Sequence, residues 1–179
     1  MATYVNNDYD LDFSTTGIEA YKVKVSTKGV ATLTKVDEVP AGTPVLLVKD
    51  GGATEDIPVI TGAAAVTGND LVAGTGAGVA TIDGDYTNMI LNTVDGNVGF
   101  YFAAGQTVAA NKAYLHIAST LAPDAAAARM LFVFDGETTA ISNVKQATSE
   151  GAVYNLSGQR VSQPAKGLYI VNGKKVVIK

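Results

Sequence analysis

Apolar and polar side chains alternate over several stretches of this sequence, and turns rich in Gly, Asn and Asp separate those stretches. In residues 20–26 (AYKVKVS), the apolar side chains of Tyr21, Val23 and Val25 alternate with two lysines and a serine. This period of two is typical of a half-buried β-strand, in which successive side chains point to opposite faces. Runs of β-branched and aromatic residues predict further strands at 30–36, 44–49, 113–117 and 130–135.

Two dipeptides predict tight hairpins. Asp95-Gly96 divides the apolar run 89–102 (MILNTVDGNVGFYF), and Asn172-Gly173 divides another apolar run close to the C-terminus. Both dipeptides favour a type I′ turn, because the two central residues of that turn need a positive φ angle. Counting outward from the two turns predicts these cross-strand partners: Val94 with Asn97, Leu91 with Phe100, Ile90 with Tyr101, Tyr169 with Val176, and Leu168 with Val177.

The spacing of strands and turns predicts an all-β protein, an antiparallel β-sandwich with a C-terminal β-meander docked on it. We assign the sandwich to residues 1–136, a polar linker to 137–151 and the meander to 152–179. Because about 30 residues are too few to bury a core of their own, we expect the meander to pack on the sandwich or on another molecule.

Some segments depart from the strand pattern. The glycine-rich stretch 62–78 predicts a long surface loop with a short strand at Leu71-Val72. Asp124 is a suitable N-cap for a short helical turn over residues 125–128, the only helix that the sequence supports. Residues 155–158 (NLSG) fit a type I turn at the start of the meander.

Composition indicates a folded chain without cysteine chemistry. Hydrophobic residues make up 47% of the 179 residues, and the net charge is −4. Nucleic acid is not an expected partner, because binding it needs a basic patch, and the absence of cysteine excludes disulfides and thiolate metal sites. The chain has no run of about 18 apolar residues, so we expect no membrane span. It has no signal peptide either, and we expect that any export signal has been removed ahead of Met1.

The C-terminal segment 152–179 (AVYNLSGQRVSQPAKGLYIVNGKKVVIK) carries a family resemblance. Its features are Tyr154-Asn155, Gly158, Val161, Gly167-Leu168-Tyr169 and the closing Lys179. In these it resembles the type A sorting domain linked to type IX secretion in Bacteroides- and Prevotella-type bacteria. The stretches AYKVKVSTKGVATLTKVDEVPAGTPVLLV, NDLVAGTG and Gly99–Ile117 are also similar to a module that precedes this tail in such proteins.

The resemblance implies export, a β-sandwich and a location outside the cell or on its outer surface. It implies no substrate, because such tails follow many unrelated activities. Whether the tail is cleaved off or retained is left open by the resemblance.

Candidate chemistry is sparse. His116 is the only histidine, and a catalytic triad or a histidine-based metal site needs more partners, so we interpret it as a solvated strand residue. Asp8, Asp10 and Asp12 alternate in DYDLD. On a strand they would share one face, where clustered carboxylates suit calcium or form a solvated edge that blocks strand pairing.

Other candidate sites lack the context that their chemistry needs. Residues 74–78 (GTGAG) imitate a phosphate loop, but a strand-like run follows where a nucleotide site needs a helix. A glycosidase needs two carboxylates across a cleft, whereas the glutamates are scattered, mostly beside turns. We therefore predict a protein that is not an enzyme and has no cofactor or metal. The glutamates are Glu19, Glu38, Glu55, Glu137 and Glu150.

Two functions fit this pattern. The first is a structural protein that associates with itself or with other surface proteins, because the end segments of the chain have the apolar pattern of strands that complete another sheet. The second is a carbohydrate-binding or adhesin module, with Tyr4, Tyr9 and Tyr86 as candidate ligand contacts, since sugar rings stack on tyrosine. The candidate donor residues for strand addition are Tyr4 and Val5 in the segment 2–6, and Leu168, Tyr169, Ile170, Val171, Val176, Val177 and Ile178.

Overall fold

The computed structural model describes residues 1–49, 51, 54–124 and 128–135 in full, and the backbone of four strands beyond residue 152. By its contacts the chain divides into two units, Met1–Ala140 and Ile141–Lys179, and this boundary falls inside the segment predicted as a linker. Every regular element in the described residues is a strand except one 3₁₀ turn, η1 (Ser119–Leu121). The prediction of an all-β fold is confirmed.

Sheet I contains the longest pair of strands in the first unit. It has five strands in the order β1-β6-β3-β4-β13. All neighbours are antiparallel except β13, which runs parallel to β4, so the predicted antiparallel arrangement is wrong at this pair. Its strands are β1 (Ala2–Tyr4), β6 (Val45–Val48), β3 (Glu19–Thr27), β4 (Val30–Val36) and β13 (Leu131–Phe134).

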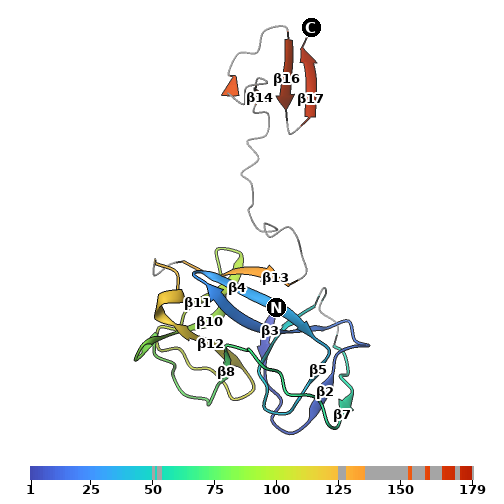
Figure 1. Cartoon of the computed structure of the whole chain (residues 1–179), viewed down its shortest axis with the longest axis vertical. Helices are drawn as coiled ribbons and strands as arrows, with labels where there is room; N and C mark the ends of the chain where they lie inside the picture. The colour runs from blue at the N-terminus through green and yellow to red at the C-terminus, as the bar shows by residue number, and fades with distance from the viewer. Residues whose placement is uncertain are drawn as a thin grey trace. The chain divides into compact units, whose positions relative to one another are not determined.

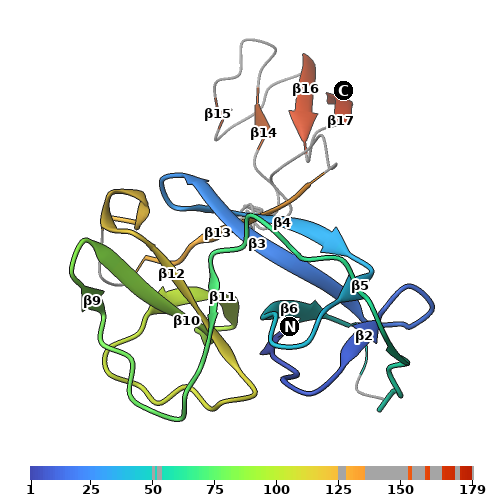
Figure 2. The ribbon, with the colours of Figure 1, turned by 60° about the horizontal axis from the view of Figure 1, so that its bottom comes forward.

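Two further sheets complete the first unit (Figures 1 and 2). In Figure 2, sheet II lies near the end of β3 and sheet III near its beginning. Sheet II has the order β11-β10-β12-β8, with β9 paired to β10, and sheet III has the order β5-β2-β7. Sheet II contains β8 (Leu71–Ala73), β9 (Ile82–Asp83), β10 (Tyr86–Val94), β11 (Asn97–Phe102) and β12 (Ala113–Ala118), and sheet III contains β2 (Asp10–Asp12), β5 (Glu38–Val39) and β7 (Val59–Ile60).

The larger core lies between sheets I and II. Val23 and Leu33 from sheet I are fully buried with Phe100 and Leu115 from sheet II. Burying each such side chain stabilises the fold by about 1.5–3 kcal/mol. The packing of two sheets about this core is that of a β-sandwich, as predicted.

A second core lies between sheet I and sheet III. It contains Ala20 and Val45 from sheet I, together with Leu11 and Val39 from sheet III. Ala20 precedes the strand residues that enter the larger core, so the alternation of side chains along β3 supplies both cores.

The predicted hairpins have the predicted partners. β10 and β11 pair Leu91 with Phe100, and the turn residues Asp95 and Gly96 both have positive φ angles, as a type I′ turn requires. In the second unit, β16 and β17 pair Tyr169 with Val176. The other three predicted pairs, Val94 with Asn97, Ile90 with Tyr101, and Leu168 with Val177, are also confirmed.

The second unit contains a four-stranded sheet in the order β15-β14-β16-β17. Residues 125–127 of the predicted helical turn and the predicted turn at 155–158 lie outside the described residues. No helix in the described part of the chain is long and apolar enough to cross a membrane. The strands are β14 (Val153–Tyr154), β15 (Arg160–Val161), β16 (Gly167–Val171) and β17 (Lys174–Ile178).

Candidate functional site

The N-terminal strand β1 connects sheet I to sheet II. All three of its residues pair with β6 of sheet I, in the same chain. On the side of sheet II, the hydroxyl of Thr3 accepts a hydrogen bond from the backbone N–H of Ala113, at 3.1 Å. The backbone N–H of Val5 donates to the carbonyl of Asn111, also at 3.1 Å. We call this junction the β1 seam.

Two residues of the β1 seam are almost fully buried. Only 5% of Thr3 and 2% of Val5 are exposed. Val5 belongs to the larger core, and Tyr4 packs against the second core. Removing the strand would therefore open a groove lined by apolar side chains and unpaired backbone groups.

The β1 seam meets the surface at a depression of about 280 Å³. Thr3, Lys112 and Ala113 line it from the seam, and Ile90 and Val108 line it from the outer part of sheet II. Part of the contact between β1 and sheet II is therefore already open to solvent.

A compact turn follows β1. The side-chain oxygen of Asn6 accepts hydrogen bonds from the backbone N–H groups of Asp8, at 2.9 Å, and Tyr9, at 3.1 Å. The carbonyl of Asn6 accepts a third bond, from the N–H of Gly42 at 2.6 Å. This turn connects β1 to β2, so its backbone conformation would have to change if β1 left sheet I.

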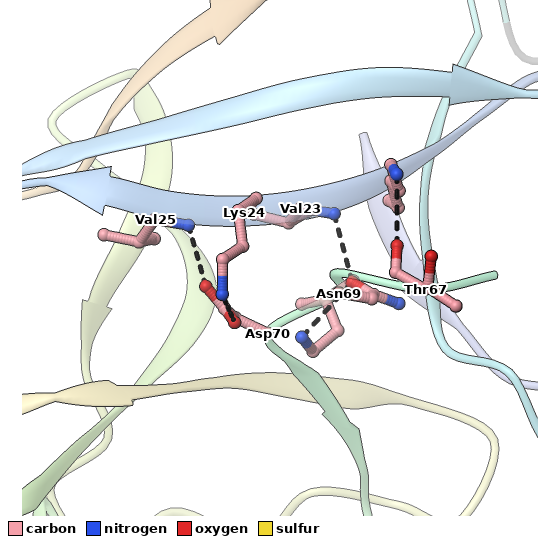
Figure 3. Close-up of polar contacts among 8 residues, drawn as sticks. Val23, Lys24, Val25, Thr67, Asn69 and Asp70 are labelled. Atoms are coloured by element: carbon pink, nitrogen blue, oxygen red, sulfur yellow. Dashed lines mark hydrogen bonds and ion pairs between the residues drawn. The ribbon is translucent and has the colours of Figure 1, made fainter.

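A second junction between sheets I and II lies in the chain interior. Beyond Tyr21, β3 has no partner strand on the β6 side, and Asn69 and Asp70 take the place of one (Figure 3). The N–H of Val23 donates to the side chain of Asn69, at 3.1 Å, and the N–H of Val25 donates to the carboxylate of Asp70, at 2.7 Å. We call this junction the Asn69–Asp70 clasp.

The clasp is anchored on both sheets. On the side of sheet I, Lys24 forms an ion pair with Asp70 at 2.8 Å, and the Asn69 amide donates to the carbonyl of Pro44 at 2.7 Å. On the side of sheet II, the carbonyl of Asp70 accepts the N–H of His116, at 2.9 Å. The glycine-rich composition of this segment predicts a surface loop and gives no sign of the clasp, but the short strand predicted there is confirmed as β8.

The three alternating aspartates are not an exposed strand edge. Of the three aspartates, only Asp10 and Asp12 lie in β2. Because β2 is the central strand of sheet III, the prediction of an edge that blocks pairing is wrong. Asp10 accepts backbone hydrogen bonds from Ala41, Gly62 and Ala63, and these bonds lower the pKa of its carboxyl group. Its role is to hold two loops beside sheet III.

The two remaining aspartates also serve turns. Hydrogen bonds from the side chain of Ser14 and from its backbone N–H lower the pKa of Asp12. Asp8 lies in the Asn6 turn. In the described part of the chain, no three Asp, Glu, His or Cys side chains are grouped as a metal site.

A polar depression of about 400 Å³ is lined by Glu19, Lys35 and Lys49, and Glu55 bonds to the last of these lysines. Glu19 accepts hydrogen bonds from the hydroxyl of Tyr21 and from Lys35, while Glu55 accepts them from Lys49 and from the N–H of Gly17. These bonds lower the pKa of both carboxyl groups. Both are therefore ionised at neutral pH and unsuited to act as the general acid of a glycosidase.

The candidate tyrosines lie in different places. Tyr4 is half-buried in the β1 seam, and Tyr9 is 57% exposed in the turn that follows. Tyr86 is 47% exposed at the start of β10, where its ring stacks on His116. His116 lies on the strand β12, as predicted, but its side chain is only partly exposed and is bonded to Asn88.

The glycine-rich segment 74–78 is part of an irregular ladder and not of a phosphate loop. The N–H of Gly76 donates to the carbonyl of Val108, and Gly78 forms an isolated bridge with Thr107. A Cβ atom on Gly74 would lie 2.3 Å from the carbonyl oxygen of Ala109, so only glycine fits there. The glycines allow two backbones to approach closely.

The C-terminal donor candidates are paired with one another. Leu168, Tyr169, Ile170 and Val171 lie in β16, which pairs with the strand that contains Val176, Val177 and Ile178, namely β17.

Comparison of the chain with protein-family models, with curated proteins and with solved structures finds no match.

Proposed function

We propose that this protein is a non-enzymatic structural subunit of the bacterial cell surface, which assembles when copies exchange the N-terminal strand β1. The observation that carries this proposal is the β1 seam. There the three-residue strand β1 pairs with sheet I, its buried Thr3 bonds to sheet II, and a compact turn follows. Such a strand provides the main-chain pairing and side-chain pockets that strand addition uses.

Exchange preserves every contact of β1, because the same segment occupies the same groove in a neighbouring copy. Only the turn centred on Asn6 must open, with the loss of its two side-chain hydrogen bonds. Head-to-tail exchange of this kind gives rings or filaments, depending on whether the rotation between copies closes.

The C-terminal tail supports the location. The resemblance of residues 152–179 to a type A sorting domain argues for export and attachment outside the cell. We assign the donor role to β1 because it pairs with sheet I and also bonds to sheet II, whereas β16 and β17 pair with each other within one sheet.

Cysteine trapping tests the exchange directly, since the chain has no cysteine of its own. Ala2 and Leu47 are paired residues of β1 and β6, and directly opposite residues lie within disulfide reach. We expect the Ala2→Cys/Leu47→Cys variant, concentrated and then oxidised, to form disulfide-linked dimers and longer species on a non-reducing gel.

The matched control is a pair that cannot exchange in this way. Thr93 and Val98 are paired across the β10–β11 hairpin, so Thr93→Cys/Val98→Cys should form only a disulfide within one chain. If the β1–β6 pair also gives only monomers, and sedimentation of the unmodified chain gives a monomer mass at all concentrations, the proposal is wrong.

A further inference from the structure

The outer face of sheet II carries an aromatic pair that the strand-exchange function does not use. The rings of Tyr86 and His116 are stacked, with centroids 4.3 Å apart and an interplanar angle of 16°. Tyr86 is 47% exposed, and no hydrogen bond of its hydroxyl is present in the described part of the chain. The face and hydroxyl of this ring are therefore accessible to a ligand.

A buried amide fixes the orientation of His116. Only 4% of Asn88 is exposed, and its side-chain NH₂ group donates to the carbonyl of Ala80 at 2.9 Å. The amide oxygen must then be the atom that faces Nδ1 of His116, at 2.7 Å. Because that oxygen only accepts hydrogen bonds, Nδ1 of His116 is the donor in this contact, and the bond fixes the orientation of the ring.

The surroundings of Tyr86 are open and rich in acceptors. Its partners across the neighbouring strands are Asp83 on β9 and Ala118 on β12, which lie on the same face of the sheet. Asp83 is exposed, and Ala118 is too small to cover the tyrosine ring. The open face of Tyr86 thus lies beside a strand that carries a carboxylate, while a fixed imidazole covers its other face.

We propose that Tyr86, His116 and Asp83 form a binding site for a neutral pyranose sugar. The apolar C–H face of the sugar ring stacks on the open face of Tyr86, its hydroxyl groups donate to Asp83, and His116 supports the tyrosine ring from the other face. An anionic ligand is disfavoured by the carboxylate of Asp83 on the neighbouring strand. The site lies on β9, β10 and β12, so it does not depend on the exchange of β1.

Affinity electrophoresis tests the site on the full chain, in native gels that contain soluble glucan, mannan, galactan or xylan. We expect at least one of the four to retard the protein. The Tyr86→Ala variant should weaken this retardation by about tenfold or more, while Tyr86→Phe should largely keep it because the aromatic face remains. Tyr9→Ala is the matched control, since Tyr9 is an exposed tyrosine outside the stacked pair.

His116→Ala and Asp83→Asn should each weaken the retardation less than Tyr86→Ala does. Melting curves of each variant separate loss of binding from loss of folding. The proposal is overturned if no polysaccharide retards the protein, or if folded Tyr86→Ala is retarded as strongly as the unmodified chain. It is also overturned if the site binds tetramethylammonium and none of the sugars, because the site would then recognise a cation through the ring face.

Discussion

Sheets I and II are joined by two junctions that differ in where they lie along the chain. The Asn69–Asp70 clasp lies in the chain interior, and its residues lead directly into β8. The β1 seam makes hydrogen bonds to the same two sheets, but it does so through a paired strand. The clasp thus joins the sheets mainly with two loop side chains, whereas the β1 seam joins them with one strand that pairs along its backbone.

This difference separates stability from exchangeability. Buried contacts stabilise both junctions, but only β1 presents a strand whose main-chain pairing a second copy can supply. A strand that pairs with one sheet and also contacts a second one is what strand exchange requires. Each of the following experiments alters one junction and uses the other as its reference.

Removing β1 should have the largest effect. Deletion of residues 1–6 removes the buried Thr3 and Val5 and the pairing with β6, and should lower the free energy of unfolding by about 4 kcal/mol. A peptide of sequence ATYVNN, added in excess, should restore stability in a saturable way when unfolding by urea is followed. A loss below about 1 kcal/mol would contradict the role given to the strand.

Breaking the clasp should cost less and should not be reversible by any peptide. Asp70→Ala leaves the N–H of the buried Val25 without its acceptor, which should lower the free energy of unfolding by about 2–3 kcal/mol. Asp70→Asn keeps an oxygen for this N–H and should recover much of the loss. If adding the ATYVNN peptide also stabilised Asp70→Ala, the two junctions would not be independent.

A smaller effect is expected from one hydroxyl in the β1 seam. Thr3→Val keeps the shape of the side chain but leaves the N–H of Ala113 without its acceptor, at a cost of about 1–2 kcal/mol. Thr3→Ser keeps the hydroxyl and serves as the control. By weakening only the contact with sheet II, Thr3→Val should also increase the yield of interchain disulfide in the Ala2→Cys/Leu47→Cys trap.

Acid should destabilise the region around sheet III, which follows β1 in the chain. Asp10, Asp12 and Glu55 have pKa values below those of unfolded carboxyl groups, so their stabilisation is fully present above about pH 4–5 and is lost as the pH falls through the folded pKa values. Melting temperature should therefore fall on acidification, and Asp10→Asn should flatten this dependence. A melting temperature with the same pH dependence in both proteins would contradict the role of Asp10.

The smallest effect is expected from the exposed ion pair of the clasp. The side chain of Lys24 is 48% exposed, and such pairs contribute about 0–1 kcal/mol. Lys24→Met should therefore change the free energy of unfolding by no more than about 1 kcal/mol, in contrast to Asp70→Ala. Equal losses in the two variants would place the strength of the clasp in the ion pair and not in its backbone contacts.

The sequence predicts local structure well where a turn or an alternation determines it. Asp95-Gly96 needs two positive φ angles, and this requirement sets the register of β10 and β11. Alternation along β3 likewise predicts which of its side chains enter the larger core. Both signals come from neighbours in the sequence, so no tertiary information is needed.

Contacts between distant segments could not be predicted in this way. The parallel pairing of β13 with β4 joins residues about a hundred positions apart. In the sequence, Asn69 and Asp70 have the pattern of ordinary loop residues. Their role depends on the end of the β3–β6 pairing at Tyr21, which the sequence does not predict. Asp10 illustrates the same limit, since its three hydrogen-bond donors come from two other loops.

The position of sheet I between two cores has a consequence for how the first unit unfolds. Ala20 and Tyr21 are adjacent on β3 but belong to different cores. Loss of β3 would therefore disrupt the packing of both cores at once. Heat should therefore melt the whole unit in one cooperative transition. Amide protons of β3 that are hydrogen-bonded to β4 should then exchange with solvent only through global unfolding.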